Sequence, residues 1–255
     1  MASNDSRLLT ITGAAGRIGT FYRRHFGQRQ GWRLRLQDIR PVENPGEWEA
    51  QVSDLADLDA ARRAADGAHT ILHLAADPSP RADFYGTLLD RNIKATYNVF
   101  HAAAEAGAQR VIFASSINAV NSYPDNVQIR ATDQPRPGNV YGATKAWGEA
   151  LAATFVGQRR LPSAIAVRIG GVTHRDAIKP DARPGMLSIV VTEEDLSHLF
   201  DCCLEAGPEV GYAVVHGQSA NRFLRMEIES TRRLVGYDPK DDAFAIAESK
   251  RQVAT

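Results

Sequence analysis

Two polar side chains, Tyr141 and Lys145, lie four residues apart in a stretch with helical periodicity. That spacing places both side chains on one face of a helix. A lysine ammonium beside a phenol lowers the pKa of the phenol, so Tyr141 can accept a proton from a substrate hydroxyl while a hydride leaves the carbon. The same lysine can hold the ribose of a nicotinamide cofactor. The pair predicts hydride-transfer chemistry, although this spacing also occurs on ordinary surface helices.

A hydroxyl, Ser116, stands just after the apolar run 111–114, which predicts a strand. In an open α/β sheet, ligands gather outside the carboxyl ends of the strands. From there Ser116 can donate to the reacting oxygen and orient it beside Tyr141. Ser115 is the competing candidate. We predict Ser116, Tyr141 and Lys145 as the catalytic residues.

A glycine-rich turn follows the apolar run Leu8–Ile11 and precedes a helical pattern over residues 16–27. Glycine lets the backbone turn sharply and approach a ligand closely. The helix that begins there directs free N–H groups at the turn, which favours a phosphate. The turn therefore predicts a dinucleotide site. Its predicted cofactor contacts are Gly13, Ala15, Gly16, Arg17, Ile18 and Gly19.

An acidic residue, Asp38, ends the alternating strand pattern 32–38 and stands 19 residues after Gly19. A carboxylate at that place accepts hydrogen bonds from the adenosine ribose hydroxyls and repels a 2′-phosphate. Asp38 therefore favours NAD over NADP as the cofactor. Arg40 is a competing signal, since an arginine nearby can bind the extra phosphate.

Strand patterns alternate with helical patterns along the first two thirds of the chain, which predicts α/β architecture with a Rossmann-like, doubly wound parallel sheet. The predicted strands are 8–11, 32–38, 49–53, 70–76, 111–114, 163–169 and 212–216. The predicted helices are 16–27, 57–65, 84–106, 140–157, 193–205 and 224–235.

After Gly171 the alternation weakens. Residues 172–187 read as a polar loop, and the tail from Pro239 shows no clear core. We predict a cofactor-binding core over 1–171. Residues 172–255 then form a small C-terminal substrate-binding lobe, part of which completes the core, in a single compact unit.

Composition excludes several other classes of function. The 255 residues hold 30 Lys+Arg and 30 Asp+Glu, with 44% hydrophobic residues, so nothing favours nucleic acid or a membrane surface as partner. No apolar run reaches the length of a membrane span, and the N-terminus has no apolar signal core. Cys202 and Cys203 read as reduced core residues, which predicts a cytoplasmic location. We predict no metal ligands.

Several motifs together resemble the extended short-chain dehydrogenase/reductase superfamily, its NAD-dependent epimerase/dehydratase group. They are Thr12–Gly19, Asp38, His73–Ala76, Phe113–Ser116 and Tyr141–Glu149. Further motifs resemble uronate dehydrogenases and related archaeal sugar and sugar-phosphate dehydrogenases more narrowly. These are Tyr123–Pro124, Val167–Gly170, Met186–Ser188, Asp195–Phe200 and Val235–Asp241.

The resemblance implies oxidation at C1 of a small cyclic sugar, sugar acid or sugar phosphate to a lactone, with NAD⁺ accepting the hydride. It also implies a homo-oligomer, a dimer or larger, because helices equivalent to 84–106 and 140–157 commonly form a dimer bundle. The further cofactor contacts we expect are Asp54, Leu55, Leu74, Ala75, Ala76 and Asn92. The substrate contacts we expect are Pro78, Ser116, Asn118, Gly171, Arg175 and Arg183.

The chain departs from uronate dehydrogenases where those enzymes hold their substrate. Ile117 and Asn118 replace Asn-His, Gly171 replaces a serine, and Gly185 replaces the arginine that clasps the carboxylate. Arg175 and Arg183, with Lys179, offer a replacement site for a carboxylate or phosphate, against the alternative of a solvated polar loop.

Two other functions remain open. A nucleotide-sugar epimerase or dehydratase uses the same chemistry, but about 80 residues after Gly171 leave little room for a nucleotide sugar. A carbonyl reductase also stays open, because the chemistry is reversible. A non-catalytic NAD(P)-sensing protein is expected to have lost Tyr141 or Lys145, and both are present.

Overall fold

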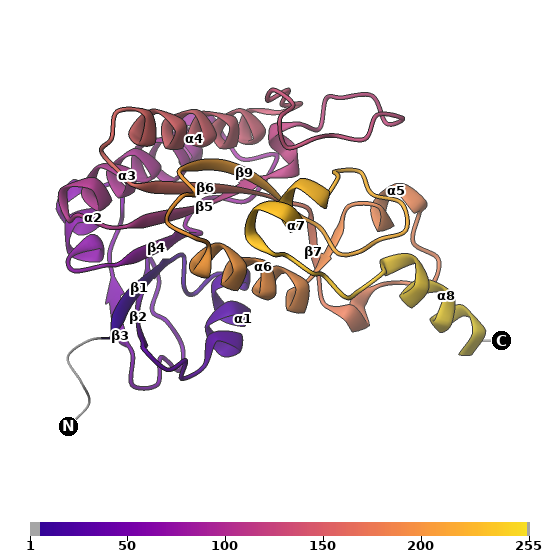
Figure 1. The fold of residues 1–255 in the computed structure, drawn as a ribbon, viewed down its shortest axis with the longest axis horizontal. Helices are drawn as coiled ribbons and strands as arrows, with labels where there is room; N and C mark the ends of the chain where they lie inside the picture. The colour runs from indigo at the N-terminus through magenta and orange to yellow at the C-terminus, as the bar shows by residue number, and fades with distance from the viewer. Residues whose placement is uncertain (1–5, 254–255) are drawn as a thin grey trace.

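The computed structural model describes residues 6–253, and seven parallel strands form its central sheet in the order β3-β2-β1-β4-β5-β6-β9 (Figure 1). The strands are β1 (Arg7–Thr12), β2 (Trp32–Asp38), β3 (Glu49–Val52), β4 (Thr70–His73), β5 (Arg110–Ser116), β6 (Ser163–Ile169) and β9 (Tyr212–Gly217). Each strand from β4 to β6 is buried along its whole length, as expected where helices cover both faces. The predicted doubly wound sheet is confirmed.

Helices cover both faces of this sheet, and each face has its own apolar core. On one face pack α2 (Leu58–Ala65), α3 (Ala95–Glu105) and α4 (Val140–Gly157). On the other face pack α1 (Arg17–Phe26) and α6 (Glu193–Glu205), where Tyr22 contacts Phe200 edge to face.

The strand order reverses at β1. The chain runs outward through β2 and β3, then returns to the other side of β1 with β4. Connections therefore diverge at the carboxyl ends of β1 and β4, and this divergence opens a crevice where open α/β sheets bind ligands.

A smaller lobe follows β6 and is seen at the right of Figure 1. It contains a two-stranded parallel sheet of β7 (Gly171–Thr173) and β8 (Val190–Thr192), with the short helix α5 (Pro184–Leu187) and a 3₁₀ turn, η3 (Arg175–Ala177). The prediction that 172–187 is wholly loop is therefore wrong. Its short elements gave no periodic signal because each is only three or four residues long.

The tail also differs from the prediction. Residues from Ala243 form helix α8 (Ala243–Val253), and its apolar side packs against the lobe. Ala243 and Ala247 are fully buried there, against Ile178 and Leu187. The tail therefore has a core, supplied by segments more than fifty residues earlier in the chain.

One predicted helix begins later than expected, and another differs in helix type. Helix α7 (Glu229–Val235) begins five residues after the predicted start at 224, because Met226 instead pairs in extended conformation with Ile129. The backbone N–H of Ile129 donates to the Arg225 carbonyl at 2.9 Å. The predicted helix 84–106 consists of a π-helix, η1 (Phe84–Lys94), followed by α3.

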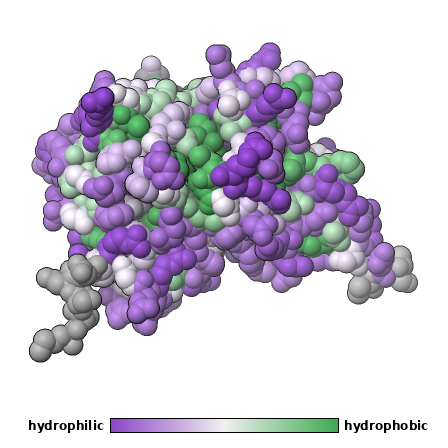
Figure 2. Space-filling model, viewed as in Figure 1, coloured by the Kyte–Doolittle hydropathy of each residue, from purple (hydrophilic) through white to green (hydrophobic). Residues whose placement is uncertain are grey.

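The surface seen in Figure 2 is mainly hydrophilic, with small groups of hydrophobic residues between the polar ones. Among residues 6–253, none of the helices combines the length and apolarity needed to cross a bilayer. The N-terminal residues 1–5, to which the prediction of no signal segment applies, lie outside the described part.

Candidate active site

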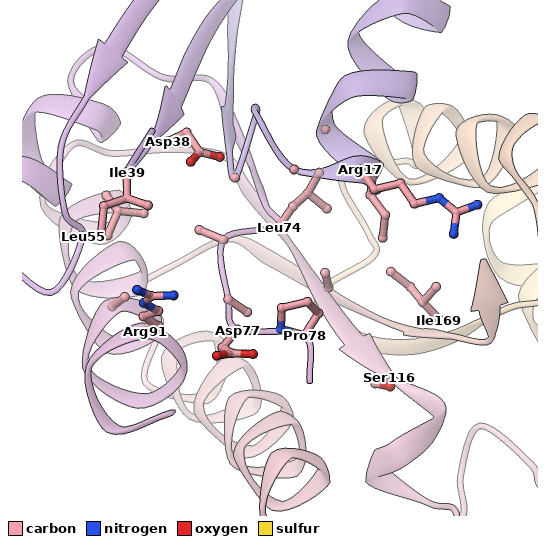
Figure 3. A pocket seen from close by; sticks show the side chains of 18 of the residues that line it. Arg17, Asp38, Ile39, Leu55, Leu74, Asp77, Pro78, Arg91, Ser116 and Ile169 are labelled. Atoms are coloured by element: carbon pink, nitrogen blue, oxygen red, sulfur yellow. The ribbon is translucent and has the colours of Figure 1, made fainter. Parts of the chain in front are cut away.

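A cavity of about 890 Å³ lies along the carboxyl ends of β1, β2, β4, β5 and β6 (Figure 3). The crevice expected from the topology is therefore present, and its volume suits a dinucleotide with a small second ligand. Most of the predicted site residues lie on its wall: Gly13, Gly16, Arg17, Ile18, Gly19, Asp38, Asp54, Leu55, Leu74, Ala75, Ala76, Pro78, Ser116, Asn118, Tyr141 and Lys145.

The glycine turn lines the cavity at the carboxyl end of β1. Gly13 has φ +72°, and a Cβ there would lie 2.7 Å from the backbone nitrogen of Ala75, so the turn needs glycine at this position. Gly16 caps α1 without any side-chain hydrogen bond to the first turn of the helix. The first N–H groups of α1 are therefore available to an anion, and the turn fits the diphosphate of NAD.

Asp38 lies buried at the end of β2, and its carboxylate is held in place by backbone groups. Oδ2 accepts from the Ala15 N–H at 2.9 Å, and Oδ1 accepts from the Arg40 N–H at 3.0 Å. Both oxygens retain a free lone pair, so the carboxylate can still accept hydrogen bonds from ribose hydroxyls. The Arg40 guanidinium is exposed and donates to the Ala15 carbonyl at 3.1 Å.

Tyr141 and Lys145 come from the first turns of α4, which is capped by Asn139 accepting from the Gly142 N–H at 2.7 Å. The Lys145 ammonium donates to the Ala114 carbonyl at 2.9 Å and lies 5.7 Å from the centre of the Tyr141 ring. The predicted arrangement of both side chains on one helix face is present. Burial lowers the pKa of Lys145 to about 8.

The pKa of Tyr141 departs from the prediction. Burial raises it, the hydrogen bond with the Ser116 hydroxyl lowers it, and the nearby Asp77 carboxylate raises it, with a net result above the ordinary value. The prediction that Lys145 brings the pKa of this phenol toward neutrality is therefore wrong for the chain by itself. The Ser116 hydroxyl also accepts from the Asn118 N–H at 3.1 Å, which fixes it at the cavity wall.

The buried ammonium of Lys145 destabilises the fold, and replacement by an uncharged side chain should remove this destabilisation. The unfolded lysine keeps its proton up to about pH 10.5 and the folded one up to about pH 8, so stability rises with pH between these values. Below pH 8 the charged form lowers the free energy of unfolding by about 3 kcal/mol. We expect Lys145→Met to raise the melting temperature at pH 7 by about 5 °C, after loss of the bond to Ala114, and by less at pH 10. Calorimetry at both pH values measures this.

Lys94→Met, at an exposed position, is the matched control and should leave the melting temperature unchanged at both pH values. A lower melting temperature for Lys145→Met at pH 7 would contradict the prediction.

Five predicted site residues lie off the cavity wall. Ala15 acts through Asp38, as described above. Asn92 is buried, and its side chain accepts from the Asp77 N–H at 2.8 Å and donates to the Asp77 carbonyl at 3.1 Å, so it shapes the loop before Pro78. Gly171 stands between the wall residues Gly170 and Val172.

The two arginines predicted for substrate also lie outside the cavity wall. Arg175 pairs with the largely buried carboxylate of Asp241 at 2.8 Å. Arg183 precedes α5 at its N-terminus. The polar loop therefore uses Arg175 to anchor the segment before α8, and the pattern of cations gave no sign of this pairing.

Ser115, the competing candidate for the catalytic serine, also lies on the wall. Other residues on the wall were missed at the sequence level: Gln37, Ile39, Ser53, Asp77, Arg91, Ala95, Ala114, Ile169, Gly170 and Val172. Most of them lie next to a strand end, so only their position in the fold marks them as site residues. Arg91 and Ala95 come from η1 and the start of α3, and no motif marks them.

The structure combines a doubly wound sheet, a glycine turn at its switch point and a buried Tyr–Lys pair. Together these features define the class of dinucleotide-binding oxidoreductase folds. The model of the NAD dependent epimerase/dehydratase family matches residues 9–172, and the chain belongs to this family. The resemblance seen in the sequence motifs is confirmed.

Individual dehydrogenases are similar to this chain over most of its length. The chain is 35% identical to the NAD-dependent glucose-6-phosphate dehydrogenase of Haloferax volcanii, over 91% of this chain and 93% of that protein. It is 33% identical to the uronate dehydrogenase of Pseudomonas syringae pv. tomato, over 92% and 82% respectively. A mutant of Agrobacterium tumefaciens uronate dehydrogenase complexed with NAD superposes with a TM-score of 0.85 at 29% identity, over 98% of this chain and 89% of that one.

Proposed function

We propose that the protein is an NAD-dependent dehydrogenase that oxidises a hydroxyl, at C1, of a small sugar, sugar acid or sugar phosphate. The observation that carries the proposal is the single cavity that joins the glycine turn and Asp38 to Tyr141, Lys145 and Ser116. The names of the similar dehydrogenases support the substrate class.

In the proposed reaction, Tyr141 accepts the proton of the substrate hydroxyl, and Ser116 donates to the same oxygen and orients it. Lys145 holds a positive charge at the base of the site, where it stabilises the Tyr141 phenolate that accepts this proton. NAD⁺, when bound, accepts the hydride. The buried positions of all three side chains exclude water from the reacting groups.

The size of the lobe supports a small substrate. The residues after β6 form β9 of the main sheet, the β7–β8 pair and helices. The wall on this side is formed by Ile169, Gly170 and Val172, and neither Arg175 nor Arg183 reaches it. We propose that Pro78, Ser116 and Asn118 contact the substrate.

A screen of NAD⁺ reduction over uronates, aldoses and aldose phosphates tests the proposal. Absorbance at the NADH band should rise with at least one member of these classes. Absence of reduction with all of them, by protein that binds NAD⁺, would contradict it.

We also propose the finer features of this assignment. The Asp38 carboxylate supports NAD over NADP, although Arg40 stands beside it.

Exposed apolar side chains on η1, α3 and the start of α4 support a homo-oligomer through these helices: Tyr85, Leu89, Tyr97 and Val140. The free thiols of Cys202 and Cys203 support a cytoplasmic location.

A further inference from the structure

Three side chains of α4, spaced one turn apart, meet the last three residues of β5. Lys145 donates to the Ala114 carbonyl at 2.9 Å, and Tyr141 lies close enough to Ser116 for the serine hydroxyl to lower the pKa of the phenol. Between these two contacts, Ser115 donates to the Glu149 carboxylate at 2.6 Å. Two of these contacts belong to the proposed catalytic residues, and the third has no place in the proposed reaction.

Glu149 forms a buried ion pair with Arg168 of β6. The Arg168 guanidinium donates to both carboxylate oxygens, at 2.9 and 2.8 Å, and the side chains are only 2% and 3% exposed. Such bidentate geometry fixes the orientation of both groups. Arg168 is also the residue directly opposite Ser115 in the register of β5 and β6, so both project from the same face of the sheet.

The packing of α4 on β5 makes this connection rigid. A Cβ on Gly148 would lie 2.3 Å from the Phe113 ring, so the helix contacts the strand without a spacer between them. At that separation, a rotation of α4 about its axis moves Tyr141 and Lys145 relative to Ser116. A carboxylate locked by Arg168 opposes that rotation.

We infer that Glu149 is a positioning residue for the proposed reaction: held by Arg168, it binds Ser115 and so fixes α4 against the end of β5. The inference rests on the proposed function, because it assumes that Tyr141 and Ser116 act on one substrate oxygen. Glu149 itself does not lie on the wall of the active-site cavity.

Two sets of variants test the inference without relying on a single substitution. Ser115→Ala removes the hydroxyl and leaves the ion pair intact, and Ser115→Thr keeps the hydroxyl. The double variant Glu149→Leu, Arg168→Met removes both buried charges together, because removal of one partner alone leaves an uncompensated charge and a fold at risk.

We expect kcat to fall about tenfold in Ser115→Ala and about a hundredfold in the double variant, the loss that a misplacement of about 1 Å produces. The dissociation constant for NAD⁺ should change less than twofold, and Ser115→Thr should restore most of the activity. The assay is NAD⁺ reduction with D-glucuronate or glucose 6-phosphate, together with calorimetric titration of NAD⁺ and the melting temperature.

Ser163→Ala is the matched control. Ser163 is also a buried serine on this sheet and accepts from the buried Arg110 guanidinium at 2.9 Å, but at the opposite end of the strands from the cavity. The variant Ser163→Ala should have a lower melting temperature and an unchanged kcat, as expected for the loss of a purely structural contact.

The outcomes separate the two ideas. If the folded double variant keeps the kcat of the original chain while Tyr141→Phe is inactive, the positioning role is wrong and the proposed function stands. A loss confined to Ser115→Ala also overturns it, because the hydroxyl then acts directly. If Tyr141→Phe keeps full turnover, Tyr141 is not the base, and only failure of the original chain to reduce NAD⁺ with any of these sugars overturns the proposed function.

Discussion

Replacing Tyr141 by phenylalanine should lower kcat for NAD⁺-dependent oxidation by about a thousandfold, within the range that a positioned general base contributes. The ring remains, so the packing of α4 on β5 and the wall of the cavity are kept. Only the hydroxyl that takes the substrate proton in the proposed reaction is lost. The dissociation constant for NAD⁺ should change little, because the glycine turn follows β1, whereas α4, which carries Tyr141, contacts β5, two strands away in the sheet.

The pH dependence gives a second measurement on the same residue. Burial and Asp77 raise the pKa of Tyr141, so at neutral pH most of the phenol is protonated and cannot act as a base. The rate of oxidation should therefore increase as the pH rises from 7 to about 8, where Lys145 begins to lose its charge. In Tyr141→Phe the residual rate should lose this increase, and a slope unchanged from that of the original chain would assign the base to another group.

The parts of the site that could be predicted from the sequence are those that depend on neighbours along the chain. Gly13 and Gly16 mark a turn because only backbone geometry is involved, and Tyr141 and Lys145 share a helix face through their spacing of four. Asp38 follows from the length of one βαβ unit. Each of these signals is contained in fewer than thirty residues.

What could not be predicted depends on register between distant elements. The pairing of Arg175 with Asp241 joins residues 66 positions apart and removes a cation that seemed available to the substrate. The contact between Glu149 and Arg168 needs α4 to lie directly on β5 and β6. The raised pKa of Tyr141 follows from burial, which a spacing pattern does not measure.

The second large effect concerns the choice of cofactor. Asp38→Ala should shift the ratio of kcat/KM for NAD to that for NADP by about two to three powers of ten toward NADP. Loss of charged hydrogen bonds to the ribose costs about 1.5–3 kcal/mol for NAD. Removal of the carboxylate also removes its repulsion of a 2′-phosphate. Arg40, whose Nε lies 3.7 Å from the Asp38 carboxylate, is then available to the phosphate.

A double variant isolates the role of the arginine. Asp38→Ala, Arg40→Ala should lose the part of the gain for NADP that Arg40 supplies and keep the loss for NAD, because the phosphate then meets neither repulsion nor a cation. Arg40→Ala alone keeps the carboxylate, so its preference for NAD should remain. Steady-state kinetics with both cofactors at saturating sugar measure all three variants. If Asp38→Ala leaves the ratio unchanged, the carboxylate does not face the adenosine ribose, and its bonds to Ala15 and Arg40 serve only to hold the turn.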